Sequence, residues 1–96
     1  MDGFDPRDVV GIQGIEGYLK SKIDVFPNPA NDFIQIKSSN GALIEMVSVY
    51  DLSGKIVFEN MMNEIETTIN TTELKGFYFV KIQTNKGILV EKILIN

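Results

Sequence analysis

The 96-residue chain contains no cysteine and no histidine. The absence of cysteine excludes disulfides and thiolate nucleophiles. The absence of histidine removes the commonest general base, the commonest metal ligand and every Ser-His or Cys-His catalytic pair. The two absences together argue against an enzyme, and we expect neither catalytic residues nor a cofactor or metal site.

Basic residues and long apolar runs are also scarce. The 13 acidic and 9 basic residues give a net charge of -4, whereas nucleic-acid binding requires a basic surface. No apolar run approaches the roughly 20 residues of a membrane span. The opening MDGFDPRDVV has acids where a signal peptide has bases, and it lacks an apolar core. We expect no nucleic-acid partner, no membrane span and no N-terminal export signal, so the chain is either cytoplasmic or a piece of a longer protein.

The first 22 residues differ from the rest. They are rich in glycine, proline and acidic residues, and their apolar residues follow neither a period of 2 nor one of 3.6 for long. Gly11, Gly14 and Gly17 argue against more than a turn of helix. We interpret residues 1–22 as a flexible linker or the tail of an upstream passenger, and residues 23–96 as one folded domain.

Residues 23–96 consist of short runs in which β-branched and aromatic residues dominate, as is typical of β-strands. Turn residues separate the runs, notably Asp-Leu-Ser-Gly at 51–54 and a tight hairpin at 84–87. The expected strands cover residues 23–26, 33–36, 44–50, 55–59, 65–69, 77–83 and 88–95. Their regular spacing, without an amphipathic helix, predicts an all-β fold: a compact immunoglobulin-like Greek-key β-sandwich of about seven antiparallel strands.

Alternation along the strands predicts which side chains form the core. Tyr78, Val80 and Ile82 fall on one face of the sixth strand, so they should point inward. Val47 and Val49 alternate in the same way on the third strand. We expect these two valines to meet the first set from the opposite sheet.

Two prolines one residue apart interrupt the chain in Val-Phe-Pro-Asn-Pro-Ala at 25–30. Pro27 and Pro29 fix φ and lack a backbone N–H, and they push the residues before them toward extended conformations. Asn31 and Asp32 can then turn the chain into the second strand. The pattern predicts a rigid corner at the edge of the sandwich.

Four motifs, in order, resemble the type A C-terminal sorting domains of the bacterial type IX secretion system, the Por secretion tail family. They are VFPNPA at 25–30, VYDLSGKIV at 49–57, LKGFYFVKI at 74–82 and EKILI at 91–95. These are similar to the family's YPNPA opening, IYDLxGKxV hairpin, LxxGxYxVKI strand and closing KI strand. The resemblance covers residues 24–96 and implies the seven-stranded sandwich that the strand pattern predicts independently.

The resemblance implies a non-catalytic secretion signal. Domains of this family direct a passenger from the periplasm through an outer-membrane translocon, so the implied partners are the type IX translocon and its shuttle proteins. A sortase-like surface peptidase usually removes the domain and often joins the passenger to a lipopolysaccharide anchor. Its cleavage point would lie here in the linker from Asp5 to Lys22. The passenger would then be at the cell surface or outside the cell.

Residues that match the family's motifs form the expected recognition motif: Pro27, Asn28, Pro29, Asp51, Gly54, Gly76, Tyr78, Val80, Lys81, Lys92 and Ile93. Packing does not require Lys81 and Lys92, so these two are the better candidates for contact with the machinery. The chain departs from the family where Phe77 replaces a smaller aliphatic residue. Asn96 stands where many relatives end in a basic residue, which puts a receptor contact by that residue in doubt.

Two further hypotheses concern binding surfaces. The last strand could be an edge strand whose free backbone groups pair with a partner by strand addition, and such an edge would also permit a homodimer. Alternatively, the chain is a fibronectin-like accessory module that binds carbohydrate or a cell surface through Phe58, Phe77 and Phe79. Such a module should bind its ligand when isolated, whereas a sorting domain should bind export machinery.

Overall fold

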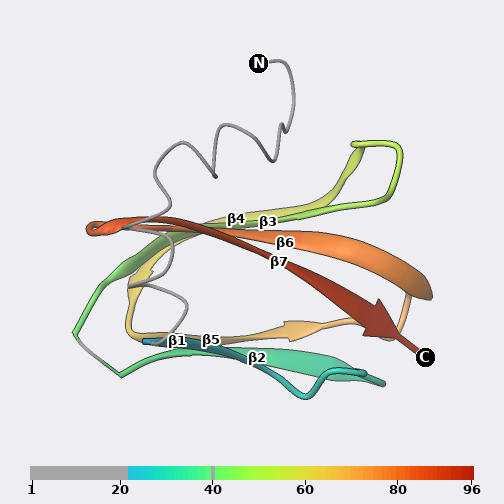
Figure 1. The fold of residues 1–96 in the computed structure, drawn as a ribbon, viewed down its shortest axis with the longest axis horizontal. Helices are drawn as coiled ribbons and strands as arrows, with labels where there is room; N and C mark the ends of the chain where they lie inside the picture. Colours follow the sequence, from blue (N-terminus) through green and yellow to red (C-terminus); the bar gives the residue numbers. More distant parts are fainter. Residues whose placement is uncertain (1–21, 40) are drawn as a thin grey trace.

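The computed structural model describes residues 22–39 and 41–96, which form seven strands in two facing sheets (Figure 1). The strands are β1 Ile23–Phe26, β2 Phe33–Ser38, β3 Ile44–Tyr50, β4 Ile56–Glu64, β5 Glu66–Asn70, β6 Gly76–Thr84 and β7 Gly87–Ile95. All pairings between them are antiparallel, so the predicted all-β sandwich is confirmed. The expected linker, apart from Lys22, lies outside the described residues.

The strand order makes β1, β5, β4 and β7 the edges of the two sheets. One sheet has the order β1-β2-β5 and the other the order β4-β3-β6-β7. The chain therefore crosses between the sheets after β2, after β4 and after β5. These crossings place strands that are distant in the sequence side by side, as in β2 beside β5 and β3 beside β6.

The core between the sheets is built almost entirely from isoleucine and valine. Val80 and Ile82 are fully buried and Tyr78 packs against the core, as the alternation along β6 predicts. Burial of one such aliphatic side chain stabilises the fold by about 1.5–3 kcal/mol. The other fully buried large side chains are Ile34, Ile36, Ile44, Val47, Val49, Ile69, Leu89, Ile93 and Ile95.

Val47 and Val49 are buried, but the expectation that they meet the β6 residues from the opposite sheet is wrong. β3 and β6 are neighbours in one sheet, where Val47 pairs with Ile82 and Val49 with Val80. A period of 2 shows which face of a strand is apolar, but it carries no information on which strand lies beside it.

β4 is longer than the sequence pattern predicts. It runs from Ile56 to Glu64, whereas the expected strand ended at residue 59. No residue of β4 is buried, so the apolar alternation that marks a half-buried strand is weak here. Pairing with β3 extends the strand, since Met61 lies opposite Met46 and Glu64 opposite Ile44.

Candidate functional site at one end of the sandwich

The antiparallel topology brings the separate sequence motifs to one end of the sandwich, at the right of Figure 1. We call it the motif end. It consists of the β1–β2 connection at 27–32, the β3–β4 turn at 51–55, the β5–β6 connection with the start of β6 at 71–76, and the last residues of the chain at 92–96. Segments from the whole length of the domain thus share one surface region.

Asn28 joins the opening motif to the last strand. Its Nδ2 donates to the carbonyl oxygen of Lys92 at 3.4 Å, and its Oδ1 accepts from the N–H of Leu94 at 3.2 Å. A side-chain amide offers the same donor and acceptor as a peptide group. Asn28 therefore takes the place of a neighbouring strand along the outer edge of β7.

Ala30 continues this pairing toward the end of β7. Its N–H donates to the carbonyl oxygen of Leu94 at 2.8 Å, and its own carbonyl accepts from the N–H of Asn96 at 2.7 Å. The Ala30 side chain is fully buried. Pro27 and Pro29, each preceded by a cis peptide bond, bring no N–H that would need an acceptor at this corner. β1 ends at Phe26, as the prolines predict.

Asp51 organises the β3–β4 turn. Its Oδ1 accepts from the Ser53 hydroxyl at 2.6 Å, from the Ser53 N–H at 2.9 Å and from the Lys55 N–H at 3.0 Å. These bonds, above all the one from the Ser53 hydroxyl, hold the pKa of Asp51 below its ordinary value of 3.8. Gly54 adopts a φ of 89°, where glycine alone is unstrained. Both motif residues therefore have a conformational role.

Several other motif residues also support the fold. Gly76 opens β6 with a φ of 102°, and the Tyr78 hydroxyl accepts from the Lys75 N–H at 3.2 Å. Val80 and Ile93 lie in the core. The fold alone therefore explains why these four positions carry glycine, tyrosine, valine and isoleucine, and no contact with a partner protein is needed to explain them.

Lys81 and Lys92 differ from these residues because both lie on the outer face of the four-stranded sheet. The Lys92 Nζ lies 4.7 Å from the ring centroid of Phe77, which is 47% exposed. Lys81 is half-buried and pairs across the sheet with Val90. Neither lysine is part of the core cluster, so a role for them in recognition stays a prediction.

The three aromatic residues of the accessory-module hypothesis do not share a surface. Phe58 lies opposite Val49, a core residue, and packs against the core. Phe77 and Phe79 alternate with the inward-facing Tyr78 and Val80, so they lie on the outer face. Phe58 therefore does not contribute to the outer face that carries Phe77 and Phe79.

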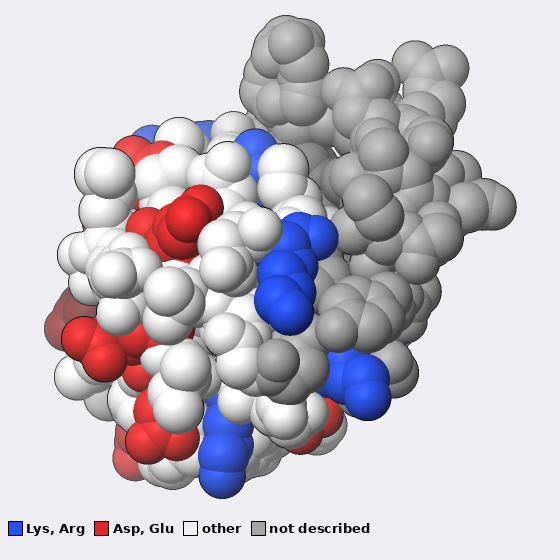
Figure 2. Space-filling view, turned by 90° about the vertical axis from the view of Figure 1, so that its left-hand side faces the viewer, with Lys and Arg blue, Asp and Glu red and all other residues white. Residues whose placement is uncertain are grey.

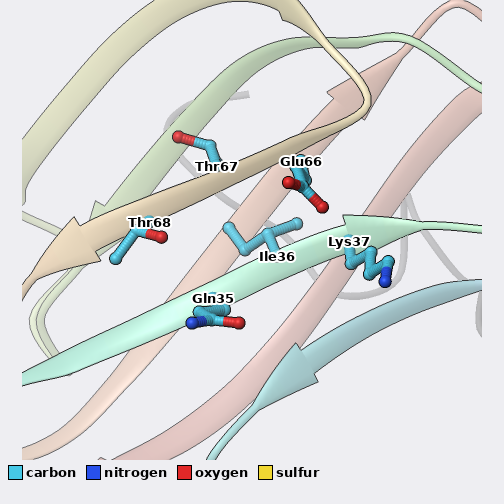
Figure 3. Close-up of a pocket in the computed structure, with 6 residues that line it drawn as sticks. All are labelled: Gln35, Ile36, Lys37, Glu66, Thr67 and Thr68. Carbon is cyan, nitrogen blue, oxygen red and sulfur yellow. The ribbon is translucent and has the colours of Figure 1, made fainter.

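A shallow hollow of about 220 Å³ lies between β2 and β5 (Figure 3). Its lining is mostly polar and comprises Gln35, Ile36, Lys37, Glu66, Thr67 and Thr68. Within residues 22–39 and 41–96, no group of His, Cys, Asp and Glu residues could hold a metal ion. The same part of the chain has no helix that could cross a membrane.

The opposite end of the sandwich is where the chain enters the domain. Figure 2 shows this end, on which lysine and acidic side chains both appear among uncharged residues. The carbonyl oxygen of Lys22 accepts from the N–H and the hydroxyl of Ser39 at 2.9 and 3.0 Å. These bonds anchor the start of β1 at the end far from the motif end.

A comparison with known families agrees with the motifs. The family model described as a secretion system C-terminal sorting domain matches residues 24–96. No curated protein matches the chain. The matched range includes every residue of the expected recognition motif and all of the seven strands except Ile23.

Proposed function

Because the chain belongs to the family of secretion system C-terminal sorting domains, we propose that it is a non-catalytic address domain that its export machinery reads at the motif end and the adjoining outer face of β6 and β7. Family membership establishes a sorting signal for type IX secretion, and hence export across the outer membrane.

The arrangement of the two ends carries this proposal. The chain enters the domain at one end through Lys22, and the segments that hold most of the motif residues lie at the other. A folded passenger joined upstream would therefore be tethered at the end opposite the motif end. The outer-membrane translocon and its shuttle proteins could then contact Lys81 and Lys92 while the passenger stays attached.

We further propose that residues 1–22 act as a linker and residues 23–96 as the domain, with cleavage between Asp5 and Lys22. A sortase-like surface peptidase needs an extended substrate. From Ile23 onward the backbone of β1 is paired along its length with β2, which withholds it from a protease cleft. Cleavage upstream would release the passenger, or join it to a surface anchor, after transit through the periplasm.

An export assay tests the function. A periplasmic signal, a fluorescent protein and residues 1–96 are fused and expressed in a bacterium with an active type IX system and in its translocon-deficient mutant. We expect fluorescence at the surface or in the medium only in the competent strain. The size of the released reporter locates the cleavage.

The matched control carries residues 1–22 alone, and it should stay in the periplasm of both strains. Retention of the complete fusion in both strains, with the domain folded, would contradict the proposed function. Binding of a polysaccharide by the isolated chain would then favour the accessory module instead.

A further inference from the structure

The free half of the β7 edge forms a second candidate surface. We propose that this edge, with Lys81 and Lys92 beside it, accepts an extended, carboxylate-bearing segment of a partner protein as an added strand. The surface is defined by backbone geometry and charge. Only the identification of the partner as a component of the export machinery rests on the proposed function.

The edge of β7 is divided into a covered and a free half. Asn28 and Ala30 bond the Lys92 carbonyl and both backbone groups of Leu94. Alternate residues of a strand direct their backbone groups to the same side. The N–H and C=O of Ile88 and Val90, and the N–H of Lys92, therefore point outward from this edge. Within residues 22–39 and 41–96 no hydrogen bond reaches these groups.

The outer face beside this free half is cationic. The outward side chains of β6 and β7 are Phe77, Phe79, Lys81, Gln83, Ile88, Val90, Lys92 and Leu94. They include two lysines and no acidic residue, although the net charge of the chain is -4. A strand added at Val90 would place its side chains next to Lys92 and one strand away from Lys81, so carboxylates are the complementary charges.

The structure disfavours a second copy of the chain as the occupant. Two copies joined in antiparallel fashion through β7 would centre on Val90 and place Lys92 of each copy opposite Ile88 of the other, so neither Lys92 would meet an acidic group. The covered half limits the contact further, since only Ile88 to Lys92 offer outward groups. A partner strand that carries carboxylates beside Lys92 supplies the charge complementarity that a second copy lacks.

The opening motif sets the length of the added strand. Asn28 already bonds the Lys92 carbonyl, so a partner can pair from Ile88 only as far as Lys92. Recognition through main-chain bonds over this short stretch tolerates varied side chains on the domain. The role of Asn28 is then to position the partner as well as to cover the edge.

A binding experiment on the 96-residue chain tests the edge directly. The probes are two synthetic peptides, one alternating valine with glutamate and the other valine with lysine. We expect the acidic peptide alone to slow hydrogen exchange at the amides of Ile88, Val90 and Lys92, by tenfold or more at saturation. Added salt should weaken its binding, because the lysines are near the surface.

Substitutions at one position separate main-chain pairing from side-chain effects. Val90→Pro removes an outward N–H and should abolish the protection, whereas Val90→Thr keeps the N–H and should preserve it. Leu89→Pro removes an N–H that points toward β6, so it should unfold the domain instead. Equal protection by both peptides, protection confined to β4, or unaltered binding by Val90→Pro would overturn the proposal.

The same variants in the export reporter connect the edge to secretion. We expect Val90→Pro and Lys81→Glu to reduce export at least tenfold. Lys37→Glu changes the net charge by the same amount on the other sheet, and it should leave export unchanged.

Failure of the wild-type fusion to be exported would contradict the proposed function and leave peptide binding intact. Full export of Val90→Pro would overturn only this inference. A concentration-dependent dimer that Val90→Pro abolishes would identify a second copy as the occupant and also overturn it.

Discussion

The side-chain oxygen of Asn28 accepts a hydrogen bond from the backbone N–H of Leu94, 66 positions further along the chain. The same amide group donates to the carbonyl oxygen of Lys92. The first and the last sequence motif therefore hold each other in place. A motif that reads as a local proline corner is thus also a long-range contact that covers part of the edge of the sheet.

Loss of the Asn28 amide should destabilise the domain. Asn28→Ala removes both hydrogen bonds to β7, and we expect the free energy of unfolding to fall by about 1–2 kcal/mol, since a net hydrogen bond contributes about 0.5–1.5 kcal/mol. Urea denaturation measures the change. Asn63→Ala, at an exposed position of β4, is the control and should change stability by less than about 0.5 kcal/mol. Equal losses of stability in the two variants would contradict a stabilising role for the Asn28 hydrogen bonds to β7.

Shortening a buried side chain should lower the free energy of unfolding far more than shortening an exposed one. Ile82 is fully buried and Ile56 is 46% exposed. Ile82→Ala should lower the free energy of unfolding by about 2–5 kcal/mol, because it leaves a cavity. Ile56→Ala should lower it by less than about 1 kcal/mol. Thermal unfolding followed by circular dichroism compares the two, and similar midpoints would be incompatible with the assigned core.

Gly54 should resist replacement for a conformational reason alone. Its φ is 89°, and no heavy atom lies within 4 Å of an added Cβ. Gly54→Ala should therefore destabilise the turn by about 1–2 kcal/mol, the cost of a left-handed L-residue. Asparagine tolerates a positive φ better than alanine does, so Gly54→Asn should lose less stability than Gly54→Ala. Chemical denaturation of the wild type and the two variants ranks their stabilities. A Gly54→Ala variant as stable as the wild type would contradict the prediction and show that the turn relaxes.

The Asp51 carboxylate should make stability depend on pH. Its pKa in the folded state is held below the ordinary value of 3.8 by the Ser53 and Lys55 hydrogen bonds. The stabilisation is therefore fully present above that value and is lost as the pH falls through the lower folded pKa. The difference in the free energy of unfolding between the wild type and Asp51→Asn should be constant from pH 7 to 5 and should shrink below about pH 4. Urea midpoints across this range measure it, and a constant difference down to pH 2 would exclude the mechanism.

Lys92 and Phe77 should show a small energetic coupling. The ammonium nitrogen lies 4.7 Å from the ring centroid, and cation–π contacts at exposed sites contribute about 0.5–1 kcal/mol. A double-mutant cycle with Lys92→Met and Phe77→Leu measures the coupling from the free energies of unfolding. A coupling of zero would mean that the outer face leaves Lys92 unconstrained and available to a partner.

The sequence by itself determined the features that depend on neighbouring residues. Period-2 alternation along β6 identified Val80 and Ile82 as core residues. The Asp51 and Gly54 pair identified a tight turn, because side-chain capping and a positive φ are local properties. Motif order identified the family over residues 24–96. The alternation and the turn are each read within a few positions of the chain, and the family is read from the order of four short motifs along it.

Only the tertiary structure decided which distant segments meet. The sheet that contains Val47 and Val49, the length of β4, the bonds of Asn28 to β7 and the division of the β7 edge all depend on pairing between remote strands. An apolar face is satisfied by burial against any complementary face, so local pattern leaves the partner undetermined. The choice among partners is made when loop closure and packing of the whole core act together, because neither is encoded in a single strand.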